Sequence, residues 1–274
     1  MLRATKVRIY PTQEQADFLI AQFGAVRFAY NKALHLKSHM YRKHGKQSSY
    51  HCVGVKVLDG AIKLPKMKPI KANIHREIIG TVKSITLSLS KTGKFYASIL
   101  VDDDIEAPAL IHTVSKVTGI DLGLTHFAIE SNGRKTANPR YLKRAEKNLK
   151  RKQRQLSRKK KGSANRAKAR LLVAKCHEKV ANARADFQHK LSRTLVDKNH
   201  AVIVETLKSA NMMKNHKLAK HIADASWHSF VVKLEYKLKE KGKHLVKVDQ
   251  WYASSKTCHC CGYKMEEMPL SVRK

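Results

Sequence analysis

Two acidic residues of this sequence occupy positions at which an acid usually has a chemical task. Asp121 lies in the apolar stretch GIDLGL, with Ile120 and Leu122 pointing to the opposite face of the expected strand. An acid within an apolar strand is costly unless it is paired or bound to a cation. Glu205 ends the apolar run AVIVE, and α/β sheets usually place their ligand sites at the carboxyl ends of strands. On neighbouring strands, these acids would hold paired Mg²⁺ or Mn²⁺ ions roughly 4 Å apart, which activate water and stabilise the leaving oxygen of a phosphodiester.

The glycines around Asp121 bear on the same hypothesis. Gly119 and Gly123 lie two residues from it on its own face, where the absence of a side chain lets a ligand or a backbone approach. The alternative is structural: a strand-end acid that pairs with one of the many Lys or Arg residues. For either acid taken alone, this alternative is the favoured interpretation.

Cys258 and Cys261 have the C-x-x-C spacing of a zinc knuckle, on a turn that Gly262 helps to close. A structural zinc ion takes four tetrahedral ligands, usually from two such pairs, and no second pair follows in the sequence. The two residues between the cysteines stand too close in one turn to complete the set. Because structural zinc contributes about 10–16 kcal/mol in small modules, we expect an incomplete Zn²⁺ half-site and loosely held residues 252–274. Zinc shared by two chains is a weaker alternative.

The charge of the chain is far from balanced, with 56 Lys and Arg against 21 Asp and Glu, a net charge of +35. Such a chain needs a polyanion as its partner, and nucleic acid is the usual one. Residues 140–170 carry 15 Lys or Arg and one acid, Glu146. A charge run is often only a solvated face, but the overall excess favours contacts with a phosphate backbone. The candidate contacts are Lys147, Lys150, Arg151, Arg154 and Arg158.

The other bulk features exclude several classes. No apolar run approaches the roughly 20 residues of a membrane-spanning helix, and the start MLRATKVRIYPTQEQ is too polar for a signal peptide. Five cysteines, three of them within 258–261, do not form the pattern of a disulfide framework. We therefore expect a protein of a reducing cytoplasm that does not bind membranes.

The first half of the chain has strand and helix signals. Residues 1–48 read as a short strand and then a helix that begins at Thr12, whose spacing to Gln15 is that of a capping box. Leu19 and Phe23 begin its apolar stripe, which Val26 and Tyr30 continue. Residues 49–108 contain four short strands around turns at Asp59-Gly60 and Thr92-Gly93. These strands favour a small antiparallel barrel or sheet.

The second half alternates strands and helices. Over residues 109–250 we expect a strand through GIDLGLTHFAIE, a turn at Asn132-Gly133, and a second strand. A helical hairpin follows over 141–198, broken at Gly162-Ser163, and then the strand AVIVE. The stretch ADASWHSFVVKLEYKLKEKG predicts an amphipathic helix, and HLVKVDQW a last strand. This order indicates a layered α/β domain, followed by the cysteines in residues 251–274.

Three stretches in order, GIDLGLTHFAIESNG, VIVETLK and SSKTCHCCGYK, resemble the RuvC-like nuclease of the TnpB (OrfB) proteins. These proteins are carried by bacterial insertion sequences and are similar to the type V CRISPR effector nucleases. The opening KVRIYPTQEQADFLIAQFGAVRFAYNKAL and the stretch LAKHIADASWHSFVVKLEYKL also resemble segments of the family. The match covers almost the whole chain, and three ordered motifs are far more specific than one.

The resemblance implies an RNase H-like (RuvC) mixed α/β sheet with an inserted helical hairpin, preceded by a small β-barrel-like wedge domain with an N-terminal helix. It implies RNA-guided cleavage of DNA in transposition and recombination, with guide pairing selecting the sequence. Asp121 matches the first catalytic aspartate and Glu205 the catalytic glutamate, both with Mg²⁺ or Mn²⁺. Cys258 and Cys261 match the first half of a zinc ribbon. The implied partners are DNA and a guide RNA, and a transposase of the same element is a further candidate.

The sequence also departs from the family pattern. Family members have a second C-x-x-C and a third catalytic aspartate after the first pair, which would fall beyond Lys274, and a long helical region that YRKHGKQSSYHCVGV mostly replaces. Loss of transition-state stabilisation of ~4 kcal/mol lowers a rate about 10³-fold, so we expect the 274-residue chain alone to be a truncated, catalytically defective copy. The alternatives are a non-catalytic RNA- or DNA-binding protein, such as a repressor of its own element, and a basic structural RNA-binding protein.

Overall fold

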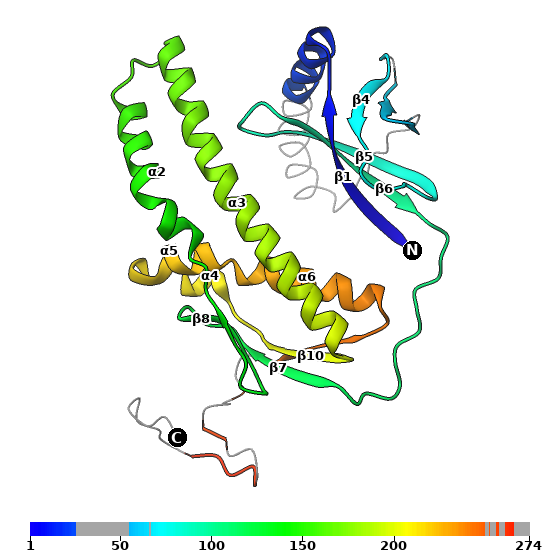
Figure 1. Cartoon of the computed structure of the whole chain (residues 1–274), viewed down its shortest axis with the longest axis vertical. Coiled ribbons are helices and arrows are strands. Elements are labelled where there is room, and N and C mark those ends of the chain that lie inside the picture. Colours follow the sequence, from blue (N-terminus) through cyan, green and yellow to red (C-terminus); the bar gives the residue numbers. More distant parts are fainter. Residues whose placement is uncertain (26–54, 66, 250–251, 253–255, 258–260, 266–274) are drawn as a thin grey trace, which may run out of the picture. The chain divides into compact units, whose positions relative to one another are not determined.

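The computed structural model describes residues 1–25, 55–65, 67–249, 252, 256–257 and 261–265 (Figure 1). The chain divides into two compact units, Met1–Glu106 and Ala107–Lys274. Each unit has its own sheet and its own apolar core.

The first unit is a six-stranded antiparallel sheet in the order β2-β3-β4-β1-β6-β5. Its strands are β1 (Leu2–Tyr10), β2 (Lys56–Leu58), β3 (Ala61–Lys63), β4 (Ile70–Asn73), β5 (Thr81–Leu89) and β6 (Phe95–Asp102). The predicted turns at Asp59-Gly60 and Thr92-Gly93 are confirmed, because they join β2 to β3 and β5 to β6. β1 lies between β4 and β6, so the start of the chain is a central strand of this sheet.

A helix over residues 13–25 covers the apolar core of this sheet. The predicted capping box is confirmed, since the Thr12 amide donates to Gln15 Oε1 (3.0 Å) and the Gln15 amide donates to Thr12 Oγ1 (3.3 Å). Leu19 is buried and Phe23 packs against the same core, as the apolar stripe predicted. Val26 and Tyr30, the other two residues of that stripe, lie outside the described residues.

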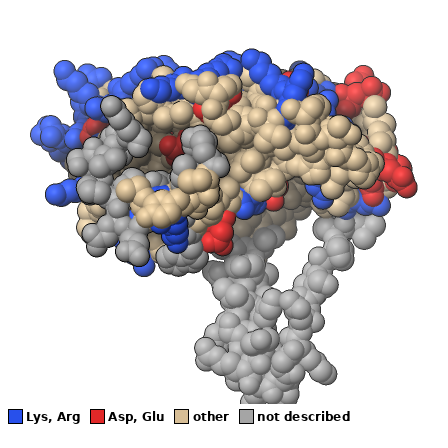
Figure 2. Space-filling view, turned by 90° about the horizontal axis from the view of Figure 1, so that it is seen from below, with Lys and Arg blue, Asp and Glu red and all other residues tan. Residues whose placement is uncertain are grey.

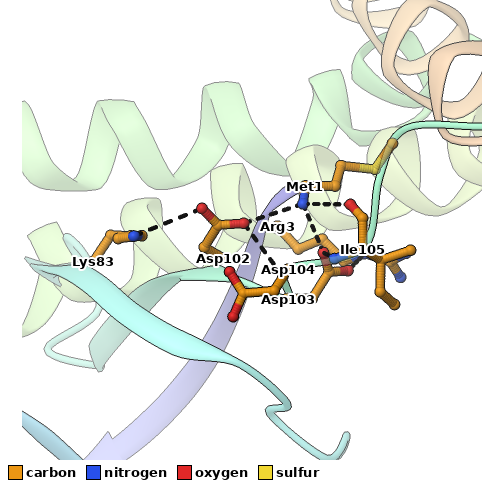
Figure 3. A network of polar contacts seen from close by, with 7 residues as sticks. All are labelled: Met1, Arg3, Lys83, Asp102, Asp103, Asp104 and Ile105. Atoms are coloured by element: carbon orange, nitrogen blue, oxygen red, sulfur yellow. Dashed lines mark hydrogen bonds and ion pairs between the residues drawn. The ribbon is translucent and has the colours of Figure 1, made fainter.

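An acidic corner holds the ends of β1 and β6 together (Figure 3). The Met1 ammonium group donates to Asp102 Oδ1 (3.1 Å) and to the Ile105 carbonyl (2.7 Å), and it lies 2.8 Å from Asp103 Oδ1. Arg3 Nε lies 2.6 Å from Asp103 Oδ2. Asp102 and Asp103 therefore each have a cation within ion-pair distance.

The second unit is a five-stranded mixed sheet in the order β11-β10-β7-β8-β9. Its strands are β7 (Val117–Asp121), β8 (His126–Glu130), β9 (Lys135–Ala137), β10 (Ala201–Glu205) and β11 (His244–Val248). β7, β8 and β9 are antiparallel neighbours, whereas β10 is parallel to both β7 and β11. This order and these directions are those of an RNase H-like sheet, the fold that the family resemblance implied.

Five helices accompany this sheet in the described residues: α2 (Tyr141–Ser157), α3 (Ala164–Lys198), α4 (Ser209–Met212), α5 (His216–Ala225) and α6 (Trp227–Glu240). α2 and α3 are the predicted hairpin inserted between β9 and β10, side by side in Figure 1. Their break falls where it was expected, and the Ser163 side chain accepts from the Arg166 amide to cap α3.

One core joins the sheet to α3, α5 and α6. Phe127 of β8 meets Phe187 of α3 and Phe230 of α6 edge to face, with 5.1 Å between ring centroids in both pairs. Ile120 of β7 and Val204 of β10 are buried in the same cluster. The carboxyl ends of the parallel strands are therefore fixed by packing from one side.

Two sequence-based expectations about this unit are wrong. GIDLGLTHFAIE is two strands, β7 and β8, because the chain turns after Asp121 and the Gly123 amide donates to the Phe127 carbonyl (3.3 Å). The expected single helix from residue 223 is also interrupted, because Ser226 adopts a left-handed φ of 54° between α5 and α6. The Gln188 side-chain amide donates to the Ala225 and Ser226 carbonyls and holds that break.

Candidate functional site

Asp121 and Glu205 are the last residues of β7 and β10. The two strands are parallel, and the pairing of Ile120 with Val204 directly precedes both acids. Paired strands lie about 4.8 Å apart and side chains alternate between faces, so both acids leave the same edge on the same face. The structure thus brings the two sequence-predicted acids together.

The two carboxylates differ in their surroundings. Asp121 is exposed, so the expectation of an acid within an apolar strand is corrected: it ends the strand, and only Ile120 and Leu122 beside it are buried. Glu205 is half-buried. Burial, and to a lesser extent the negative charge of Asp121, raise the pKa of the Glu205 carboxyl above its ordinary value. In the described part of the chain, neither side chain forms a hydrogen bond or an ion pair.

Both acids line one cavity of about 340 Å³ at the carboxyl edge of the parallel strands. Gly119 lines it too, and a Cβ there would lie 3.7 Å from Ser131 Cβ, an ordinary contact. Gly123 has another role, because a Cβ there would meet the His126 carbonyl oxygen at 3.0 Å within the β7–β8 turn. Of the two glycines expected to leave the face of Asp121 bare, Gly119 opens onto the cavity and Gly123 serves the turn.

Two further residues of this cavity follow the end of β11. Asp249 follows β11 directly, and Tyr252 lies three residues later, its amide donating to the Asp249 carbonyl (3.1 Å). β11 is parallel to β10, with Val248 beside Glu205. The available signal was the strand order: a third parallel strand must end at the same edge of the sheet.

The oxygen donors of this cavity suit a hard divalent cation better than a soft one. Among the described residues, no group of three or more His, Cys, Asp or Glu side chains is placed to hold a metal ion. Mg²⁺ in nucleotide and nucleic-acid sites is usually bound by one or two carboxylates, with waters and substrate phosphates as its other ligands. Two unpaired carboxylates at an open cavity are therefore a donor set that such an ion fits.

The predicted zinc half-site is described only in part. Cys258 lies outside the described residues, and Cys261 is an exposed free thiol. Thr257 and Lys264 form an antiparallel bridge, and the Met265 amide donates to the Lys256 carbonyl (2.9 Å). Most of residues 252–274, which were expected to be loosely held, likewise lie outside the described part.

The predicted phosphate-contacting residues share one helix. Lys147, Lys150, Arg151, Arg154 and Arg158 all line a trough of about 820 Å³ along α2. Lys150 differs from the other four because its charge is paired with an acid: its ammonium group lies 2.9 Å from Glu146 Oε1. On the face displayed in Figure 2, Lys and Arg side chains gather along the upper and left borders, whereas Asp and Glu form small separate groups, the largest at the right.

A mixed sheet of this order, with two acids meeting at the carboxyl ends of its parallel strands, defines an RNase H-like α/β protein. The OrfB family model described as "Probable transposase" matches residues 101–216. Models described as "Helix-turn-helix domain" and "Cas12f1-like, TNB domain" match residues 1–46 and 227–274.

Relatives of known sequence extend the match to the whole chain. The chain is 33% identical over 339 residues to a "Putative RNA-guided DNA endonuclease" of Streptomyces pristinaespiralis, covering 99% of this chain and 83% of that protein. It is 32% identical over 253 residues to "Putative RNA-guided DNA endonuclease InsQ" of Escherichia coli K12, covering 85% of this chain and 62% of that one. This chain belongs to the TnpB (OrfB) family.

A solved Cas12f1-sgRNA-target DNA complex aligns with a TM-score of 0.43 and 19% identity, over 68% of this chain and 39% of that one. The chain thus spans about two fifths of that protein and less than two thirds of InsQ. No helix in the described part of the chain has the length and apolar character needed to cross a membrane.

Proposed function

We propose that this protein binds Mg²⁺ or Mn²⁺ through Asp121 and Glu205, as the metal-binding acids of a RuvC-type DNA endonuclease directed by a guide RNA. The observation that carries the proposal is that two carboxylates lie at the ends of adjacent parallel strands and have no cation as a partner among the described residues. The relatives named as RNA-guided DNA endonucleases support the same reaction class.

Each side chain of the pair has a distinct part in this proposal. When bound, divalent cations supply a water of lowered pKa and stabilise the charge of the leaving phosphodiester oxygen. Asp121, being exposed, offers its oxygens to the cavity directly. Glu205, whose pKa is raised by burial and by Asp121, gains most from a neighbouring positive charge, because that charge restores its ionised form.

Metal binding by the whole chain tests the proposal. Calorimetric titration with Mn²⁺ should show binding by the wild type and at least about tenfold weaker binding by Asp121→Ala and by Glu205→Ala, since each removes one carboxylate. Asp186→Asn is the matched control, because Asp186 is an exposed acid on α3 paired with Lys190. Equal Mn²⁺ affinity of the wild type and both alanine variants would refute the proposal.

Cleavage is a separate measurement. The chain, Mn²⁺ or Mg²⁺, a guide RNA encoded by the element and a matched DNA target are combined, and strand breaks are counted. The sequence predicts little or no break by these 274 residues alone, and that stays a prediction. A break that Asp121→Ala abolishes would show the chain to be an active nuclease.

We also propose that α2 contacts a nucleic-acid backbone. Lys147, Arg151, Arg154 and Arg158 are exposed on one helix face, and in the described residues no acid pairs with them. Each phosphate contact releases condensed counterions, so affinity should fall steeply with salt. Arg151→Ala and Arg154→Ala should each weaken RNA and DNA binding and reduce the salt slope by about one unit. Lys190→Ala on α3, already paired with Asp186, should change neither.

Nucleic-acid binding without cleavage is the second candidate function, and the basic face of α2 favours it independently of the acids. The same set of variants separates the two candidates. An Asp121→Ala chain that binds as the wild type does, where neither chain binds Mn²⁺, supports a non-catalytic binding protein or repressor.

The zinc proposal is limited to half a site. Cys258 and Cys261 supply two thiolates, and a structural zinc ion takes four ligands. Zinc content after purification, compared between the wild type and Cys261→Ser, measures what the pair holds. We expect less than one zinc per chain, and a stoichiometric ion lost in Cys261→Ser would contradict that expectation.

A further inference from the structure

Tyr252 has an unusual position for an aromatic residue. It lines the same cavity as Asp121 and Glu205, and its side chain is 58% exposed. Its amide donates to the Asp249 carbonyl in the turn that follows β11. The backbone of Tyr252 is thus tied to the residue that follows β11, and Tyr252 lines the cavity of the carboxylate pair.

Three other tyrosines of the described residues have ring contacts within the chain. The Tyr10 ring carries the Arg8 guanidinium at 5.1 Å, the Tyr96 ring carries the Lys6 ammonium at 4.8 Å, and Tyr141 meets Phe187 edge to face at 6.4 Å. Tyr252 has no ring contact and no side-chain hydrogen bond with any described residue. A large apolar ring exposed at the mouth of a cavity is a surface for a ligand with a flat apolar face.

The ligand that matches this surface follows from the chemistry around it. Phosphate is repelled by two carboxylates unless a cation lies between them. A stacked base supplies attraction that does not depend on that cation, because every base has a π-face and stacks on aromatic side chains. In a duplex both faces of a base are already covered by its neighbours, so only an unpaired base is available to the ring.

We infer that the ring of Tyr252 stacks on an unpaired nucleobase next to the phosphodiester bound at Asp121 and Glu205. The inference rests on the proposed function, because it needs a nucleic-acid strand in this cavity. It assigns Tyr252 as a positioning residue: the ring selects an unpaired strand and fixes where that strand passes the acids.

The test uses the 274-residue chain and single-stranded oligodeoxynucleotides carrying one 2-aminopurine, whose fluorescence falls on stacking. Tyr252→Ala and Tyr252→Leu should bind the single strand about tenfold more weakly and lose the quenching seen with the wild type. Tyr252→Phe should retain both. The leucine variant keeps apolar bulk without an aromatic face, so it separates stacking from packing.

Two controls make the result specific. Tyr263→Ala removes an equally exposed tyrosine, 67% accessible, that does not line the cavity, and it should behave as the wild type. A fully paired duplex with the same 2-aminopurine should bind the wild type and Tyr252→Ala equally. A thermal melt of each variant shows that it is folded.

The outcomes separate this inference from the proposed function. Failure of the wild type to bind Mn²⁺ refutes the proposed metal site, and the quenching comparison is still read without the metal. Equal quenching by the wild type and Tyr252→Leu overturns the inference, as does an equal loss of affinity for single strand and duplex. A wild-type chain that binds no single strand at all also overturns it.

Discussion

The acidic pair Asp102–Asp103 of the first unit has cations of its own chain as ion-pair partners. The pair Asp121–Glu205 of the second unit has none among the described residues. Around Asp102 and Asp103 the Met1 ammonium, Arg3 and Lys83 all lie within ion-pair distance (Figure 3). Hydrogen bonds from the Met1 ammonium are the main reason that the pKa values of both aspartates are lowered. The negative charge of this pair is therefore balanced by cations of its own chain.

The pair Asp121–Glu205 has no such neighbours. Of 56 Lys and Arg residues in the sequence, none forms an ion pair with either acid in the described part of the chain. Instead the pKa of Glu205 is raised. In a chain of net charge +35, an acidic pair without an ion-pair partner among the described residues is what the proposed function assigns to a cation from solution. The surroundings of an acid, more than its presence in the sequence, are therefore the basis for proposing a metal site.

The largest expected difference between the two pairs is the response to metal. Mn²⁺ should raise the unfolding temperature of the wild type, because a ligand at about 100 times its Kd contributes about 2.7 kcal/mol. Asp121→Ala and Glu205→Ala should lose this increment, and Asp103→Asn should keep it. Differential scanning calorimetry with and without Mn²⁺ measures this rise in unfolding temperature. Loss of the rise in Asp103→Asn would contradict the assignment of the metal response to Asp121 and Glu205.

Without metal, neutralising one acid in each pair should shift stability in opposite directions. Glu205→Gln removes a half-buried charge that Asp121 repels, so the unfolding temperature should rise by a few degrees. Asp103→Asn removes the negative charge that pairs with the Met1 ammonium and Arg3, so the unfolding temperature of this variant should fall. Thermal melts in chelator-treated buffer give both shifts. Two shifts of the same sign would contradict the comparison.

The pH dependence should separate the pairs further. The pKa of Glu205 in the folded protein lies above its ordinary 4.5. The ionised carboxylate therefore destabilises the fold above the folded-state pKa, and this destabilisation disappears as the pH falls towards 4.5. The folded pKa values of Asp102 and Asp103 lie below their ordinary 3.8, so their stabilisation is present above 3.8 and is lost as the pH falls further.

Denaturant melts at several pH values make this visible. The stability advantage of Glu205→Gln over the wild type should shrink between neutral pH and about 4.5, and the deficit of Asp103→Asn should shrink only below about 3.8. A parallel change in both variants across the whole range would show that the two pairs titrate alike.

The smallest effect is expected at Glu146, which, like Asp102 and Asp103, has cations of its own chain as ion-pair partners. Its hydrogen bonds to Lys150 and then to Lys220 lower the pKa of its carboxyl to about 2. Lys150→Met should raise that pKa towards 4.5, as carboxyl NMR titration would show, and leave the unfolding temperature nearly unchanged, because exposed ion pairs contribute little. Lys143→Met, an exposed change on the same helix, should leave the pKa of Glu146 in place. A clear loss of stability in Lys150→Met would contradict the view of this ion pair as a surface feature.

The parts of the fold that local chemistry decides could be predicted from the sequence. Turns at Asp59-Gly60 and Asn132-Gly133, the cap at Ser163 and the capping box at Thr12 each follow from residues a few positions apart. The left-handed φ of Ser226 could not be predicted, because the Gln188 side chain that holds it comes from another helix.

The candidate site divides in the same way. Asp121 and Glu205 could be proposed because one acid lies in the apolar stretch GIDLGL and the other ends the apolar run AVIVE, and because three ordered motifs resemble one family. Asp249 could not be predicted because its place depends on the parallel pairing of β11 with β10, which no short pattern reports, and the same pairing decides that Tyr252 lines the cavity. The pKa shift of Glu205 depends on burial and on Asp121, and both are tertiary.

The insertion of α2 and α3 between β9 and β10 governs the order in which this site is assembled. β7, β8 and β9 are joined by short connections and can pair early, whereas β10 must return to β7 after a 35-residue helix. Such non-local pairing is slow, because chain closure precedes the contacts that reward it. Asp121 therefore leaves the ribosome well before Glu205 can join it, and capture of a divalent ion at the proposed site would report the pairing of β10 with β7 during refolding.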